Sequence, residues 1–160
     1  MKNKILDITI ILFLYFFLIL NVSANEVFNF KVTEIEIIND GNVIKGLNRG
    51  IITNENGVII NADNFEYNKL NNILNLSGNI KIEDTIKSIV IYADKAKYLK
   101  NDEKILTHGN SRALNNNGIT IEADNFEYNK LLNIFNANGN VKITDEAHEV
   151  KMNSKNITYF

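Results

Sequence analysis

The 160-residue sequence contains no cysteine and no proline, and it contains only two histidines. Without cysteine, the fold cannot be held by disulfide bonds and depends on burial and backbone pairing. His108 and His148 lie 40 residues apart in the sequence, without a cysteine or a matching acidic cluster, so they give no metal-ligating pattern. No catalytic constellation is present either. We therefore predict a protein that is not an enzyme and that holds no metal or cofactor.

The sequence also lacks an excess of basic residues, and its formal net charge is −2. Domains that bind nucleic acid normally carry a basic surface, so we expect no nucleic-acid partner. The apolar run Ile8 to Leu20 covers 13 residues, fewer than the roughly 20 that a membrane-spanning helix needs.

The N-terminal segment has the pattern of a secretory signal peptide. Lys2 and Lys4 precede the apolar run, while Val22 and Ala24 place small side chains where a signal peptidase cuts. We predict that residues 1–24 are removed in the periplasm. Asp7 beside the apolar run weakens this signal, which leaves an uncleaved membrane anchor as the alternative. Residues 25–160 are long enough for one domain with its own core.

A segment of about two dozen residues occurs twice, 61 positions apart. The sequence VIINADNFEYNK at 58–69 returns as ITIEADNFEYNK at 119–130, and a degraded copy lies at 91–100. The period is therefore 30 or 31 residues. A repeat of this size cannot bury its apolar face alone and stacks on its neighbours, so the sequence predicts one continuous repetitive body.

Each period predicts two β-strands, because Ile, Val, Phe and Tyr dominate runs of eight to twelve residues between turn signals. In the first complete period we expect strands at about 57–67 and 73–83. The chain has 29 asparagines, many of them at turns, and the pairs Asn56-Gly57 and Asn117-Gly118 predict tight hairpins.

Alternation of side chains predicts one apolar face. Along the second strand of each period, the apolar residues share one parity. In the first strand the phase slips after Ala62, and one extra residue at Asp63-Asn64, a β-bulge, restores a common face. Asp94 and Asp124 predict the same bulge. We expect these aspartates to cap exposed N–H groups there.

The repeated Ile-x-Ala-Asp-x-Phe/Ala-x-Tyr strand, followed by x-Gly-Asn-Val/Ile-x-Ile behind a signal peptide, resembles the OstA-like domain of the lipopolysaccharide-transport (Lpt) family. The family includes periplasmic bridge proteins and N-terminal domains of outer-membrane assembly proteins. The resemblance covers roughly residues 28–160. It implies a twisted, open antiparallel β-jellyroll whose interior holds the acyl chains of lipopolysaccharide and carries them across the periplasm towards the outer membrane.

On this reading the inward apolar residues line a lipid-binding trough. The alternative is that they fill a closed core. The expected trough residues are Ile60, Phe65, Tyr67, Leu74, Leu76, Ile80, Ile82, Ile91, Tyr98, Ile121, Phe126, Tyr128, Phe135, Val141 and Ile143.

The two end strands, expected at Asn29 to Ile38 and Val150 to Tyr159, present unpaired backbone groups. Their lack of proline suits them to pair edge to edge with other Lpt-type β-jellyroll domains. The apolar residues expected in these partner strands are Val32, Ile35, Ile37, Val150, Met152 and Ile157.

Two rows of basic residues recur in register, at 69, 100 and 130 and at 81, 112 and 142. We expect solvated charge that blocks aggregation rather than phosphate binding. The rival to lipid transport is an exported repetitive scaffold or adhesin with a closed core. The sequence also leaves open whether the chain is a free-standing bridge protein or the front part of a longer assembly protein.

Overall fold

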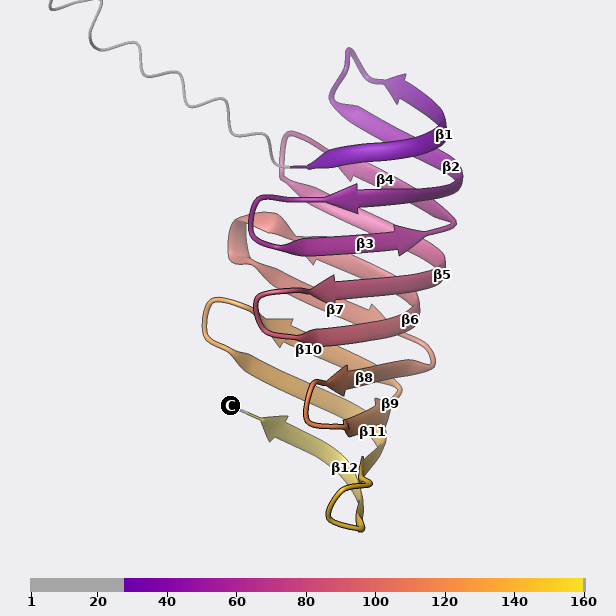
Figure 1. Ribbon diagram of the computed structural model, residues 1–160. Helices are drawn as coiled ribbons and strands as arrows, with labels where there is room; N and C mark the ends of the chain where they lie inside the picture. The colour runs from indigo at the N-terminus through magenta and orange to yellow at the C-terminus, as the bar shows by residue number, and fades with distance from the viewer. Residues whose placement is uncertain (1–27, 160) are drawn as a thin grey trace, which may run out of the picture.

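The computed structural model describes residues 28–159, which form a single antiparallel sheet of twelve strands and one short 3₁₀ turn (Figure 1). The predicted signal peptide and the predicted mature N terminus at Asn25 lie outside the described residues. The elements are β1 (Asn29–Ile38), β2 (Val43–Thr53), β3 (Val58–Ala62), β4 (Asn64–Asn68), β5 (Ile73–Asp84), β6 (Ile89–Leu99), η1 (Lys100–Asp102), β7 (Lys104–His108), β8 (Ser111–Asn115), β9 (Ile119–Ala123), β10 (Asn125–Asn129), β11 (Ile134–Asp145) and β12 (Val150–Tyr159).

The sheet folds over on itself into two layers, because every strand of the meander bends or breaks near its middle. The first layer contains β3, β8 and β9, and the second layer contains β4, β7 and β10. The long strands β1, β2, β5, β6, β11 and β12 pass through both layers. Figure 1 shows the strands stacked from β1 to β12, with the bends along one side and the hairpin turns along the other. The predicted all-β, open jellyroll of two-strand repeats is confirmed.

The bends form a corner line, which we define as residues 33, 48–49, 63, 78–79, 94, 109–110, 124, 139–140 and 155. At each bend one residue of one strand faces two of the next; for example, the β5–β6 register shifts between Ser77 and Ile80 opposite Asp94. The predicted phase slip is therefore present, but its assignment to an extra residue at Asp63-Asn64 is wrong. The additional residue lies in the facing strand, at Gly78-Asn79, where both residues have left-handed φ angles of 77° and 44°.

The repeated aspartates bind side chains rather than the backbone N–H groups that we expected. Asn79 Nδ2 donates to Asp63 Oδ2 at 2.6 Å, and the equivalent bonds join Asn110 to Asp94 and Asn140 to Asp124. The backbone N–H of each aspartate is already satisfied, because it donates to the carbonyl of the facing glycine. Each aspartate side chain therefore bonds to the asparagine that lies at the bend of the facing strand.

The opposite side of the body is the mouth, where the hairpin turns of the two layers face each other. The first-layer turns lie at 54–57, 85–88, 116–118 and 146–149, and the second-layer turns lie at 39–42, 69–72, 100–103 and 130–133. The two predicted Asn-Gly hairpins are confirmed: Gly57 and Gly118 have φ angles of 71° and 81°. Asn54 and Asn115 accept hydrogen bonds from the N–H groups of Val58 and Ile119, at 3.0 Å each.

The end strands β1 and β12 have the predicted bounds, and each pairs on one side only. The pairings that lead from β1 to β12 are all antiparallel and even in number, so the two edge strands run in the same direction. This relation governs how two copies of the body can join.

Candidate functional site

The interior between the two layers is apolar along its whole length. All fifteen residues that the sequence placed in the trough point inward: thirteen are buried, and Ile121 and Ile143 are partly buried against them. They come from β3 to β6 and β9 to β11, so the repeat aligns equivalent side chains along one axis.

Aromatic rings fill the interior at the β1 end. Phe30 stacks on Phe65 with ring centroids 5.1 Å apart. Phe28 meets the edges of Tyr67 at 5.1 Å and Tyr98 at 5.6 Å. Because these rings interlock across β1, β4 and β6, this end of the body has a packed core rather than an open channel.

The interior is open at the β12 end. A cavity of about 150 Å³ lies there between the layers. Its wall is apolar apart from Asn115, and it is lined by Ile89, Ala113, Leu114, Asn115, Ile119, Ile121, Phe135, Ile143, Ile157 and Tyr159. An enclosed cavity of comparable volume with aliphatic and aromatic walls stays dry and accepts small apolar molecules. We call this cavity the C-terminal pocket.

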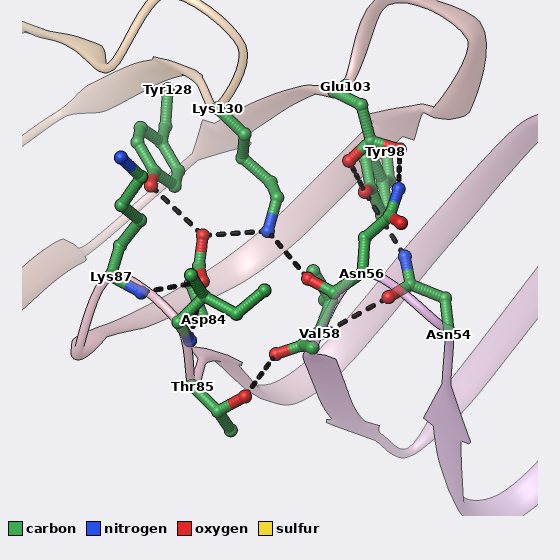
Figure 2. Close-up of polar contacts among 12 residues, drawn as sticks. Asn54, Asn56, Val58, Asp84, Thr85, Lys87, Tyr98, Glu103, Tyr128 and Lys130 are labelled. Atoms are coloured by element: carbon green, nitrogen blue, oxygen red, sulfur yellow. Dashed lines mark hydrogen bonds and ion pairs between the residues drawn. The ribbon is translucent and has the colours of Figure 1, made fainter.

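Between these two ends, polar side chains close the mouth (Figure 2). We call them the polar seam and define it as Asn54, Asn56, Asp84, Tyr98, Glu103, Tyr128 and Lys130. Every member belongs to the edge of a layer, and the hydrogen bonds between them run from the first layer to the second as well as within the second.

One half of the polar seam is centred on Asp84, at the end of β5 in the first layer. Its Oδ2 atom accepts hydrogen bonds from Lys130 Nζ at 2.7 Å and from the Tyr128 hydroxyl at 3.0 Å, both in the second layer. Its Oδ1 atom accepts the N–H groups of Ile86 and Lys87, which closes the turn after β5. Burial by itself raises the pKa of Asp84, but the bonds from Lys130, the Lys87 N–H and Tyr128 outweigh it and lower that pKa below its ordinary value.

The other half is centred on Glu103, which follows η1 in the second layer. Asn56 Nδ2, from the first layer, donates to its Oε1 atom at 2.8 Å. The Tyr98 hydroxyl and Lys100 Nζ also donate to its carboxylate, and Asn54 Nδ2 donates to the Tyr98 hydroxyl at 3.2 Å. Burial alone raises the pKa of Glu103, yet the bonds from Lys100, Tyr98 and Asn56 lower it overall.

The two tyrosines are held in their neutral form. Burial is the main cause that raises the pKa of Tyr98, and the bond to Glu103 adds to it. Burial also raises the pKa of Tyr128, together with the nearby charge of Asp84. Because each hydroxyl stays protonated, each donates a hydrogen bond to a carboxylate across the physiological pH range.

No sequence pattern revealed the polar seam, and our expectation for two lysines, Lys130 in the seam and Lys100 beside it, was wrong. We expected the row at 69, 100 and 130 to carry solvated charge. Lys69 is exposed, but the Lys130 side chain is only 8% exposed and the Lys100 side chain only 18%. The sequence holds a partial signal, because Asp84 and Asp145 end equivalent strands 61 positions apart. No local pattern shows that Asp84 faces Lys130 across the mouth.

Within residues 28–159, no group of three or more His, Cys, Asp or Glu side chains is placed to hold a metal ion. Both histidines have local partners: His108 Nδ1 lies 2.6 Å from Asn125 Oδ1, and His148 Nδ1 lies 2.8 Å from Asp145 Oδ2. The same residues include no helix with the length and apolarity to cross a membrane.

Two comparisons with known proteins agree with this architecture. Residues 59–160 match the family described as LptA/(LptD N-terminal domain) LPS transport protein. In three dimensions the chain is similar to the crystal structure of LptH from Pseudomonas aeruginosa, described as the LptA homologous periplasmic component of the conserved lipopolysaccharide transport device. That match has a TM-score of 0.64 at 11% identity and covers 83% of this chain and 94% of LptH. The chain has no match among curated proteins.

Proposed function

The chain belongs to the LptA/LptD N-terminal domain family of lipopolysaccharide transport proteins, and from this premise we propose that it binds the acyl chains of lipopolysaccharide in its interior and passes them towards the outer membrane. The proposal places the protein in the periplasm after removal of residues 1–24. LptH, which shares the fold, is described as a periplasmic component.

The C-terminal pocket is the observation that carries this proposal. Side chains leave this part of the interior unfilled, and its exposed walls are almost entirely apolar. Each methylene that moves from water into such a site contributes about 0.8 kcal/mol. Transport requires binding that is favourable but reversible, and a pocket of about 150 Å³ takes part of an acyl chain rather than a whole lipid.

Site-specific photo-crosslinking tests the proposal with a matched pair of neighbouring residues. Ile143 lines the pocket, and Lys142 points outward from the same strand. A photoreactive residue at Ile143 is expected to capture lipopolysaccharide in cells, and one at Lys142 is not. Equal capture at both positions, or none at Ile143 in a folded protein, contradicts acyl-chain binding in the pocket and favours the exported scaffold with a closed core.

The same function requires the interior to continue into a neighbouring domain, and we propose that β12 of one copy pairs with β1 of another copy or of a related Lpt domain. Both strands are exposed edges, and they run in the same direction, so a head-to-tail junction is parallel. Such a contact does not close on itself and extends as a row.

The corner line fixes the register of this junction. Aligning residue 33 of β1 with residue 155 of β12 places Ile35 beside Ile157 and Ile37 beside Tyr159, all with inward side chains.

A further inference from the structure

The polar seam makes all the hydrogen bonds that the described residues form across the mouth. They join Asp84 to Lys130 and Tyr128, Asn56 to Glu103 and Lys130, and Asn54 to Tyr98. Elsewhere the two layers are connected by the backbone, which runs continuously through the corner line on the other side. The body is therefore hinged along one side and fastened along the other.

The fastened region lies across the route between the two ends of the interior. Beneath the polar seam, Leu74, Ile82 and Ile91 are at most 1% exposed. An acyl chain that extends from the C-terminal pocket towards β1 has to enter this packed region. It has no room there unless the layers separate at the mouth.

The hydrogen-bonded chemistry of the polar seam suits repeated opening. Every buried polar side-chain atom among the described residues has a hydrogen-bond partner in the closed state. When the mouth opens, water replaces those partners, so the net free energy lost per hydrogen bond is small. A mouth closed by apolar side chains loses its full burial energy on opening, and nothing in water replaces it.

We propose that the polar seam is a latch that controls how far cargo enters. When it is closed, acyl chains reach only the C-terminal pocket; when it opens, the layers part about the corner line and admit them to the interior lined by β5. This inference rests on the proposed function, because it concerns movement of the same cargo.

An engineered disulfide across the mouth tests the latch. The sequence has no native cysteine, so only the two introduced cysteines can form the bond within one chain. The double variant Asn56→Cys, Glu103→Cys joins the first layer to the second at side chains that touch in the closed state. The matched control is Asn72→Cys, Asn101→Cys. These side chains touch at 2.9 Å but belong to two turns of the same layer.

The probe is a photoreactive fatty acid with its reactive group within the acyl chain, so no core residue is altered. Labelled peptides are mapped by mass spectrometry in the oxidised and reduced forms of both double variants and in the wild-type chain. Circular dichroism verifies that each form is folded. We expect β5 to be labelled in the wild type, in the reduced cross-mouth variant and in both forms of the control.

Oxidation of the cross-mouth variant is expected to remove labelling from β5 and to leave it on the strands that line the pocket, β6, β8, β9, β11 and β12. Labelling of β5 that oxidation does not change overturns the latch, and so does labelling confined to the pocket in every form. Both results leave acyl-chain binding intact. If no strand is labelled in the wild-type chain, acyl-chain binding fails, and the latch fails with it.

Discussion

Lys130 and Asp84 show how one residue acquires a role that its repeat partners lack. Lys69 occupies the equivalent turn position and is exposed, whereas Lys130 reaches across the mouth to a carboxylate that is 2% exposed. Two charges withdrawn from water in this way are tolerated only as a hydrogen-bonded pair. The pair therefore defines a single geometry between the layers.

Replacing Lys130 by Met is expected to lower the free energy of unfolding by about 3–5 kcal/mol, because it leaves the buried carboxylate of Asp84 without its partner. The equivalent change at the exposed Lys69 is expected to have an effect within about 0.5 kcal/mol. Urea unfolding of the two variants measures both values. Similar values for the two variants refute the role assigned to the ion pair.

The lowered pKa of Asp84 predicts a loss of stability in acid. Its folded value lies below the ordinary value of 3.8, so the unfolded chain takes up the proton first as pH falls. The stabilisation is therefore fully present above about pH 5 and is lost as pH drops through 3.8 and below the folded value. Thermal unfolding between pH 6 and pH 3 is expected to show a steeper decline for the wild type than for Asp84→Asn. If the stability of both proteins falls with pH in the same way, the Asp84 carboxylate is not the source of the acid sensitivity.

The strands owe their bends to a short repeated device: an aspartate in one strand, and a left-handed glycine and asparagine in the next. At Gly139 a Cβ atom is excluded for two reasons: the φ angle is 79°, and the added atom would overlap the Asp124 carboxylate. Gly118, in a hairpin, has a similar φ angle of 81° but open space around the position. A comparison of alanine variants at the two glycines therefore separates the cost of a steric clash from the cost of a side chain at positive φ.

Gly118→Ala is expected to lower the free energy of unfolding by about 1–2 kcal/mol, the usual penalty for a side chain in the left-handed region. Gly139→Ala is expected to cost clearly more, because Asp124 also has to move away from Asn140. Chemical denaturation gives both values. Equal losses of unfolding free energy in the two variants indicate that the bend adapts to the added methyl group and that the Asp–Asn bond does not position it.

The whole body is an open-ended stack in which both free edges are suited to a second copy. Long exposed edges normally invite aggregation and are blunted by proline or bulges. Here neither described edge strand contains proline, and each continues the corner line of the body, at residues 33 and 155. Exposed edges of this kind are consistent with a domain that works in a row.

The parallel, corner-aligned junction predicts a specific intermolecular disulfide. A mixture of the Ile35→Cys and Ile157→Cys variants is expected to form a covalent dimer on mild oxidation, because these positions lie side by side in the proposed register. A mixture of Ile35→Cys with Lys151→Cys, from the other layer of β12, serves as the control. Non-reducing electrophoresis and light scattering read out the result; a dimer that forms equally in both mixtures contradicts the register.

The sequence by itself determined the strands and their faces, because these follow from local alternation and from turn residues that recur every 30 or 31 positions. The bounds of β1 and β12, the Asn-Gly hairpins and the fifteen inward residues all follow from such short-range signals. The same repeat pointed to the family. Only the tertiary structure decided how the interior is used, because packing and pairing across the mouth join residues that are distant in sequence. Asp84 meets Lys130 across 46 positions, the rings of Phe28 and Phe30 fill one end, and a pocket remains at the other.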